Sequence, residues 1–115
     1  MKLNRILTHH SGTSRIPVEP GEIFYMEAED HDTLIRRRGK RLLRDGRGLG
    51  DLESVVKPYF LIRVHRNFIV NLRRIREIRL RKGSDGWELQ LEPPVNRIIP
   101  IGRTYEAQLW QAFDG

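Results

Sequence analysis

Residues Phe60 to Ile78 read Phe-Leu-Ile-Arg-Val-His-Arg-Asn-Phe-Ile-Val-Asn-Leu-Arg-Arg-Ile-Arg-Glu-Ile, an apolar run that basic and polar side chains interrupt. Near its start two apolar residues alternate with two polar ones, in the order Ile62, Arg63, Val64 and His65. An extended chain with this alternation buries the apolar pair and presents the polar pair. The run therefore predicts a strand with one packing face and one face that can bind phosphates or bases.

A helical interpretation of the same run is the alternative, because several apolar residues fall roughly on one helical stripe: Leu61, Val64, Phe68, Leu72 and Ile75. Two kinds of residue weigh against a helix. β-branched residues favour strands, and asparagines favour turns and strand ends. The β-branched residues that weigh against a helix are Ile62, Val64, Ile69 and Val70, and the asparagines are Asn67 and Asn71. We therefore predict strands here.

The length of the chain limits its organisation. With 115 residues it has room for one domain, but not for a sensor domain plus an output domain, so we expect an isolated module. No apolar run approaches the roughly twenty residues of a membrane span. The segment Met1–Arg5 is not followed by the apolar core of a signal peptide. We expect a cytoplasmic protein that does not engage a membrane.

Catalytic and metal chemistry find little support. The sequence has no cysteine, which excludes disulfides, thiolate zinc sites and cysteine nucleophiles. His65 has no Ser, Asp or Cys partner in a recognisable motif. The carboxylates of Glu27, Glu29 and Asp30 lie near His31 in the sequence, but loop carboxylates are usually just solvated. We expect no enzyme activity, no metal and no cofactor.

The charge of the chain points to an anionic partner. Lys plus Arg number 21 against 15 Asp plus Glu, which gives a formal net charge of +6 and a pI near 10.3. Most of the cations are Arg, whose guanidinium forks onto phosphates and guanine edges, so the bias favours a nucleic acid. Composition alone also permits an acidic protein or a membrane surface.

Two clusters hold much of this charge. The first spans residues 36–41, and the second follows the central run: Arg73, Arg74, Arg76, Arg79, Arg81 and Lys82. Each cluster is either a track for phosphates or a solvated strand edge whose charges prevent aggregation. We expect one of the two to touch the DNA backbone.

Short apolar runs separated by turn signals predict a mostly β fold of small antiparallel sheets with two short helices. Residues 1–14 are expected to form an N-terminal arm or lead strand, and residues 15–115 the main domain. Tight turns are predicted at residues 38–40 and 82–86. Eight runs predict strands: Ile23–Ala28, Leu34–Arg37, Arg41–Arg44, Phe60–Val64, Phe68–Val70, Ile75–Leu80, Trp87–Leu91 and Ile98–Ile101.

The two predicted helices follow Gly48 and Gly102. Their apolar faces are formed by Leu49, Leu52, Val55 and Val56 in the first helix and by Tyr105, Leu109, Ala112 and Phe113 in the second. Their outward positions are not basic: Asp51, Glu53, Glu106 and Gln108. DNA would repel such a face, so we expect readout from loops or strands instead of a recognition helix.

Four blocks of this sequence resemble the LytTR family of bacterial DNA-binding domains, the output domains of LytR/AlgR-type response regulators. They are Glu22–Ala28, Leu49–Val56, the run Phe60–Asn71 with Ile75, and Ile99–Tyr105. The resemblance implies a LytTR-type β-β-β arrangement, here without an attached receiver, whose loops reach into successive major grooves. It also implies a transcription regulator that binds double-stranded DNA as a homodimer or pair on direct repeats.

The same resemblance assigns candidate DNA-binding residues one at a time. His31 and Asp32 fall in the first contacting loop, Arg66 in the turn after the central strand, and Arg103 with Thr104 at the start of the last helix. His65 is expected to hold its loop through a hydrogen bond to backbone or phosphate, and Asn67 to bond a phosphate or its own turn. Each of these residues also has a plain interpretation as a loop tip or a solvated surface group.

The chain departs from the family pattern at three positions. Asn67 stands where a small hydroxyl residue is common, and Gly102 stands where Ser is frequent, which leaves a permissible N-cap without a side-chain acceptor. Thr104 stands where a second Arg is common, so Arg103 would have to carry that phosphate contact. These departures put the DNA sequence preference of this chain in doubt.

The sequence therefore predicts a sequence-specific, double-strand DNA-binding domain that regulates transcription. One alternative is a basic protein-interaction module that binds an acidic partner. The other is a small β-barrel binder of single-stranded nucleic acid, which needs exposed aromatic rings to stack bases. Four aromatic residues are instead expected on the apolar face: Phe24, Phe60, Phe68 and Trp87.

Overall fold

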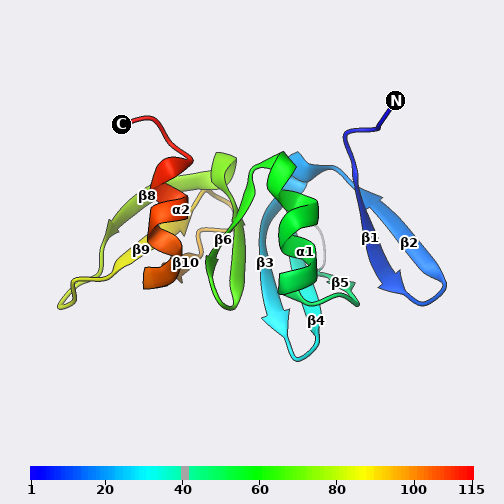
Figure 1. Cartoon of the computed structure of the whole chain (residues 1–115), viewed down its shortest axis with the longest axis horizontal. Coiled ribbons are helices and arrows are strands. Elements are labelled where there is room, and N and C mark those ends of the chain that lie inside the picture. The colour runs from blue at the N-terminus through cyan, green and yellow to red at the C-terminus, as the bar shows by residue number, and fades with distance from the viewer. Residues whose placement is uncertain (40–41) are drawn as a thin grey trace.

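The computed structural model describes residues 1–39 and 42–115, and its elements follow one another along a long axis (Figure 1). The described residues form ten strands: β1 Ile6–Ser11, β2 Ser14–Val18, β3 Ile23–Glu29, β4 Asp32–Arg37, β5 Leu43–Asp45, β6 Leu61–His65, β7 Phe68–Asn71, β8 Ile75–Leu80, β9 Trp87–Leu91 and β10 Ile98–Pro100. They also form two α-helices, α1 Leu49–Val56 and α2 Glu106–Gln111, and four short 3-10 helices: η1 Pro20–Glu22, η2 Lys57–Tyr59, η3 Leu72–Arg74 and η4 Arg103–Tyr105. The predicted mostly β fold with two short helices is confirmed.

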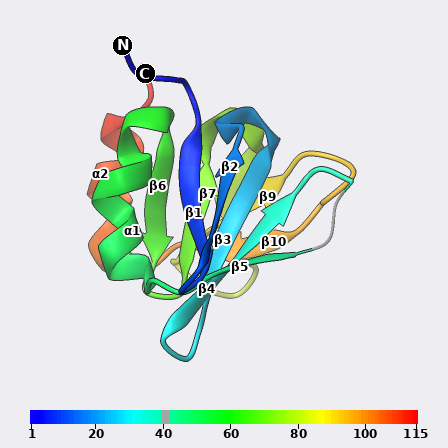
Figure 2. The ribbon, with the colours of Figure 1, turned by 90° about the vertical axis from the view of Figure 1, so that its right-hand side faces the viewer.

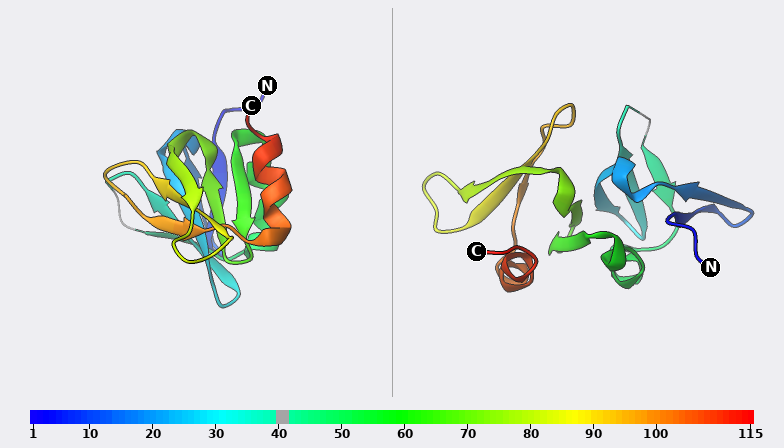
Figure 3. Two further views of the ribbon diagram at one scale, coloured as in Figure 1. Left: turned by 90° about the vertical axis from the view of Figure 1, so that its left-hand side faces the viewer. Right: turned by 90° about the horizontal axis from the view of Figure 1, so that it is seen from above.

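The strands form three antiparallel sheets. The central sheet has five strands in the order β5-β4-β3-β7-β6, and it is flanked by the hairpin β1-β2 and by the sheet β10-β9-β8. Figure 1 shows the hairpin at one end of the long axis and the three-stranded sheet at the other. Both α-helices lie on the same side of the molecule, as Figure 2 and the view from above in Figure 3 show.

Two apolar cores lie on opposite faces of the central sheet. One joins the sheet to α1 and to the β1–β2 hairpin, which contributes Ile6 and Val18. The other joins the sheet to the β8–β10 sheet and to α2, which contributes Leu109. β7 is buried on both faces: Ile69 points into the first core, and its neighbours Phe68 and Val70 point into the second. This two-sided burial explains why the strand reads as a continuous apolar run.

The strand interpretation of the central run is confirmed, except at its first residue. Ile62 and Val64 are buried in β6, and the chain turns at Arg66 and Asn67 into β7. Phe60 lies before β6, in the left-handed conformation with φ of 66°, where it ends η2. Its side chain is 50% exposed, so the expected place on the apolar face is wrong. The reversed backbone turns the ring outward as the chain enters the strand.

The N-terminal hairpin contains one strand that the sequence pattern did not predict. β1 lies within residues 1–14, and β2 begins at Ser14 and pairs with it in antiparallel register, with Ile6 opposite Val18. Alternation in Arg15-Ile16-Pro17-Val18 was an available signal, but Pro17 lowers the strand propensity of this segment. The predicted strand Arg41–Arg44 is observed as Leu43–Asp45. Lys40 and Arg41, which belong to a predicted turn and strand, lie outside the described residues.

The apolar faces predicted for the helices hold only in part. Leu49, Leu52 and Val56 are buried in α1, but Val55 is 39% exposed. α2 ends at Gln111, and Phe113 beyond it is 44% exposed. Each helix therefore contributes a narrower apolar stripe to its core than the sequence suggested.

Candidate nucleic-acid interface

Three connections come together along one edge of the molecule, the lower edge in Figure 1. They are the β3–β4 turn, the β6–β7 turn and η4, and we call them together the loop edge. β3 pairs with β7 in antiparallel register, with Glu27 opposite Phe68, so the end of β3 lies beside the start of β7. Antiparallel pairing thus carries both turns to the same edge. The sequence-predicted site residues lie on or beside these connections.

Backbone hydrogen bonds fix the three connections to one another. The Ala28 N–H at the end of β3 donates to the Asn67 carbonyl in the β6–β7 turn at 2.9 Å. The Gly102 N–H, just before η4, donates to the Val64 carbonyl at 2.8 Å. Gly102 is the N-cap of η4 and has no side-chain cap, as expected from the sequence. A Cβ at this position would lie 3.1 Å from the Tyr105 ring, so the glycine lets the ring pack closely.

Arg63 holds the backbone of the β6–β7 turn. Its Nη2 donates to the Arg66 carbonyl at 2.6 Å, and its Nε donates to the His65 carbonyl at 3.4 Å. The sequence predicted that Arg63 is presented for binding, but only 18% of its side chain is exposed. Its guanidinium is therefore engaged within the fold and is not free to contact DNA.

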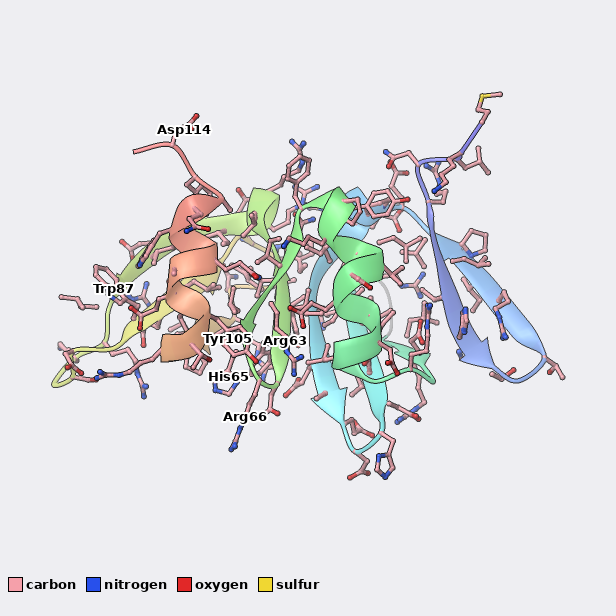
Figure 4. The ribbon with its side chains drawn as sticks, in the orientation of Figure 1. Arg63, His65, Arg66, Trp87, Tyr105 and Asp114 are labelled. Carbon is pink, nitrogen blue, oxygen red and sulfur yellow. The ribbon has the colours of Figure 1, made fainter. Side chains whose placement is uncertain are left out.

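Arg63 also links this turn to two other elements. Its Nη1 lies 3.1 Å from Oε1 of Glu53 in α1, and its guanidinium carbon lies 5.8 Å from the centre of the Tyr105 ring in η4. Figure 4 shows Arg63, His65 and Tyr105 grouped at the turn. The sequence analysis did not predict that Arg63 links these elements, because alternation shows only that its side chain points away from the apolar face of the strand. The sequence did contain one local signal for this role. Arg63 has a long side chain with several N–H donors, and it lies three residues before the turn residue Arg66, within reach of the turn carbonyls.

Arg66 is exposed at the tip of the β6–β7 turn. In Figure 4 its side chain extends away from the ribbon at the lower edge. Its guanidinium has no hydrogen bond, ion pair or aromatic contact with any residue that the structure describes. A fixed backbone with a free guanidinium is well suited to bind a phosphate or a guanine edge bidentately.

His65 holds the same turn from inside. Its Nδ1 accepts a hydrogen bond from the Asn67 N–H at 3.1 Å, and its ring packs against Phe68 at 5.8 Å between centres. Partial burial lowers the pKa of His65, and the charges of Arg66 and Arg63 lower it further. The predicted hydrogen bond between His65 and the backbone of its loop is present, with the imidazole as acceptor, and it requires Nδ1 to be unprotonated.

The β3–β4 turn differs, because the carboxylates of Glu29 and Asp32 that flank it are engaged by Arg44 of the neighbouring strand. Nη1 of Arg44 in β5 lies 3.0 Å from Oδ2 of Asp32, and its Nη2 lies 2.7 Å from Oε1 of Glu29. These contacts raise the pKa of Arg44, first through the hydrogen bonds to Glu29 and Asp32. His31 is exposed at the tip, and Figure 2 shows this hairpin projecting beyond the other strands. Asp32 is thus tied to the sheet, while His31 faces solvent.

At η4, Arg103 and Thr104 are exposed. Nη2 of Arg103 lies 2.6 Å from Oδ1 of Asp85, which belongs to the β8–β9 hairpin. Both side chains are more than 70% exposed, with 73% for Arg103 and 81% for Asp85. An ion pair this exposed is weak, so a phosphate can replace Asp85 as the partner of Arg103.

The two arginine clusters are partly engaged inside the molecule. Arg38 lies 5.3 Å from the Phe24 ring centre, and Arg73 lies 4.6 Å from that of Phe60. Arg79 contacts Glu77 and Glu88 through ion pairs of 2.5 and 2.9 Å. That one of the two clusters touches the DNA backbone stays a prediction.

Two of the three loop carboxylates considered for a metal site, Glu27 and Glu29, have cationic partners instead. Glu27 pairs with Arg97 at 2.9 Å, and Glu29 pairs with Arg44. Within residues 1–39 and 42–115, no three His, Asp or Glu side chains come together in a group that could hold a metal ion. None of the helices in these ranges is long and apolar enough to cross a membrane.

With this fold and edge described, comparison with known proteins gives the family. The chain matches the family model of the LytTr DNA-binding domain over residues 13–114. It belongs to the LytTR family of DNA-binding domains. Its fold is similar to the solved LytTr DNA-binding domain of a Bacillus cereus protein described as a methyl-accepting/DNA response regulator. That match has a TM-score of 0.74 and 21% sequence identity, and it covers 96% of each chain. A search of curated protein sequences gave no significant match.

Proposed function

We propose that this LytTR domain binds double-stranded DNA at specific sequences through its loop edge and that it thereby regulates transcription. Membership of a family of DNA-binding domains supports DNA as the partner. The net charge of +6 supports a polyanionic partner as well. In this proposal the loops enter the major groove, whose base edges carry a distinct pattern for each base pair.

The single observation that carries the proposal is the state of Arg66. Its backbone carbonyl is held by Arg63 at 2.6 Å, and its guanidinium is free among the residues that the structure describes. A base-reading side chain needs both properties, since an unfixed backbone would add an entropy cost and an engaged guanidinium would have to break existing bonds. We therefore assign direct base readout to Arg66.

The other candidate residues take supporting roles. Exposed His31 reads a base or phosphate from the β3–β4 turn, and Asp32 orients that turn through Arg44 while its free oxygen remains available to accept from a base. Arg103 leaves Asp85 for a phosphate, and Thr104 donates its hydroxyl beside it. His65 and Asn67 keep the β6–β7 turn in its bound shape.

Two copies are proposed to bind together on direct repeats, each with its loop edge facing the duplex. The molecule is 47 Å long, which at roughly 3.4 Å per base pair corresponds to about 14 base pairs of duplex. One copy therefore spans more than a single helical turn of about ten base pairs. Copies in the same orientation on neighbouring repeats would then lie close enough to contact each other.

Selection of bound duplexes from a random pool tests the proposal directly. We expect an enriched motif, repeated in the same direction, and an affinity whose logarithm falls linearly with the logarithm of salt concentration. Binding to all duplexes alike would reject sequence specificity. Affinity that scarcely changes between low and physiological salt would favour the protein-interaction alternative.

A further inference from the structure

The β1–β2 hairpin carries cations without carboxylates. Residues 1–18 contain no Asp or Glu, and His9 and Arg15 lie opposite each other in the hairpin register. Nη1 of Arg15 donates to the carbonyls of Ser11 at 2.6 Å and Ser14 at 3.2 Å. Its charge therefore has no carboxylate partner in the described part of the chain.

This hairpin is fixed to the central sheet by a buried carboxylate. Asp45 at the end of β5 is fully buried, and its Oδ2 accepts the His9 N–H at 3.0 Å. The Gly46 N–H donates to the His9 carbonyl at 2.8 Å, and Nη2 of Arg47 donates to the Leu7 carbonyl at 3.0 Å. Hydrogen bonds from Arg47 and from the backbone lower the pKa of Asp45, although burial opposes them. The hairpin is consequently held in a defined position.

A hollow of ≈ 370 Å³ lies between the hairpin and the central sheet. The hairpin lines it with His10, Ser11 and Arg15, and the sheet side lines it with Asp32, Arg44 and Arg47. Arg44 is engaged by Glu29 and Asp32, and Arg47 is engaged by Asp45. Among the described residues, Arg15 is thus the cation at this hollow whose charge is not matched by a carboxylate.

The hollow borders the loop edge and extends it along the long axis. Asp32 lines the hollow and directly follows His31 of the β3–β4 turn. Figure 1 shows the hairpin at the end of the 47 Å axis, beyond this turn. A duplex that runs along the axis past the loop edge would continue over the hairpin.

We propose that this hollow binds a phosphodiester group of the DNA backbone that flanks the sequence read by the loop edge. The free N–H groups of Arg15 are the main donors, and the hydroxyl of Ser11 adds a further donor. This inference rests on the proposed function and adds to it a contact that carries affinity without base specificity.

The test compares three variants with the wild-type domain on two duplexes. Arg15→Gln removes the charge, Arg15→Lys keeps it, and Arg5→Gln is the matched control, since Arg5 is an exposed cation on the same segment but pairs with Glu19 at 3.6 Å. The long duplex carries the selected site with about ten base pairs, roughly one helical turn, on each side. The short duplex is trimmed to the site. Urea unfolding of each variant verifies that the hairpin remains folded.

On the long duplex, Arg15→Gln should weaken binding on the order of 3- to 10-fold and lower the salt slope by about 0.9, as for the loss of one phosphate contact. Arg15→Lys and Arg5→Gln should bind nearly as the wild type does. On the short duplex, Arg15→Gln should bind with the same affinity as the wild type. Equal affinity of Arg15→Gln and wild type on the long duplex, or equal losses on both duplexes, would overturn the inference. If the wild type binds neither duplex, the proposed function fails and the inference fails with it.

Discussion

The β6–β7 and β3–β4 turns lie on the same edge, but they differ in where their charges are engaged. In the β6–β7 turn a cation inside the fold, Arg63, holds the backbone, and the cation at the tip, Arg66, is free. In the β3–β4 turn the charges near the tip, Asp32 and Glu29, are held by Arg44 from the neighbouring strand. The comparison teaches that in the β6–β7 turn the residue that fixes the backbone differs from the residue that presents the charge, so Arg66 keeps its guanidinium for a ligand.

The largest change in stability and in duplex selectivity should come from removing Arg63, the residue that fixes the β6–β7 turn. Arg63→Ala takes away two hydrogen bonds to turn carbonyls and the ion pair to Glu53, and it removes Arg63 as a partner of the partly buried His65 carbonyl and Glu53 carboxylate. We expect a loss of about 2–3 kcal/mol in the free energy of unfolding. Selectivity for the selected duplex should fall as well. Urea unfolding and binding isotherms on selected and random duplexes measure the two effects.

Arg63→Lys separates the charge from the geometry of the guanidinium. A lysine cannot reach both turn carbonyls and Glu53 together, so we expect it to recover only part of the lost stability and selectivity. If Arg63→Ala unfolds like the wild type and still discriminates between duplexes, the proposed dependence of the turn on Arg63 is wrong.

The next effect concerns the free cation itself. Arg66→Ala should cost about 1–3 kcal/mol of binding free energy on the selected duplex and much less on random duplex, because a bidentate base contact is lost. Its unfolding free energy should change by less than about 0.5 kcal/mol, as for an exposed residue without partners. Binding isotherms on both duplexes measure these losses. Equal losses of affinity on the two duplexes would show that Arg66 contributes only nonspecific surface charge.

The β3–β4 turn should respond more weakly. His31→Ala is expected to cost less than about 1 kcal/mol on the selected duplex, because a single side chain at an exposed tip forms at most a modest hydrogen bond. Asp32→Asn should change selectivity at one base pair only if its free oxygen accepts from a base. A loss for His31→Ala larger than that for Arg66→Ala would reverse the proposed ranking of the two turns.

The pH dependence of folding stability tests the role of His65 in the β6–β7 turn. Its folded pKa is lowered from 6.5, so the unfolded chain binds the proton more readily, and this group stabilises the fold above about pH 6.5. The stabilisation is lost as the pH falls through the lowered folded pKa. His9 acts in the same direction, because burial and the charges of Arg47 and Arg15 lower its pKa.

His65→Gln should therefore flatten part of the decrease in stability below pH 6.5, and His9→Gln another part, as followed by urea unfolding at several pH values. Stability that rises as the pH falls through this window, in the wild type but not in His65→Gln, would contradict the direction assigned to His65.

The smallest effect is expected away from both turns. Arg38 stacks on Phe24 at 5.3 Å, so a phosphate contact would be its main role in binding. Arg38→Ala should weaken selected and random duplexes alike, or neither, and should lower the salt slope by at most about one unit. Isotherms at two salt concentrations measure this, and a loss confined to the selected duplex would assign base readout to the first arginine cluster.

Much of the fold could be predicted because local patterns and burial agree. The alternation around Ile62 and Val64 gave β6, and the chain turned where Arg66 and Asn67 replace apolar residues. Phe60 was misplaced because periodicity counts a ring as apolar without knowing its backbone angles. The strand β2 was missed because Pro17 is acceptable only where the strand lies at an edge, and the pairing partner was not known.

The candidate site could be predicted less completely. The sequence and the family resemblance named residues that the structure places on or beside the loop edge, and they predicted the hydrogen bond that His65 makes within its loop. They did not show that Arg44 engages Asp32, that Asp85 engages Arg103, or that Arg63 supports Arg66. Of these contacts, the first joins residues 12 positions apart and the second joins residues 18 positions apart. Spacing alone cannot foresee such pairs.

The sequence by itself determined the class of this protein: a basic, mostly β domain, whose central run of alternating and β-branched residues forms β6 and β7. Those properties follow from local preferences and from composition. Only the tertiary structure decided which of its arginines are free, because a guanidinium binds whichever carbonyl or carboxylate folding brings within reach. Arg63 and Arg66 are three residues apart, yet packing against α1 and η4 engages the first and leaves the second exposed.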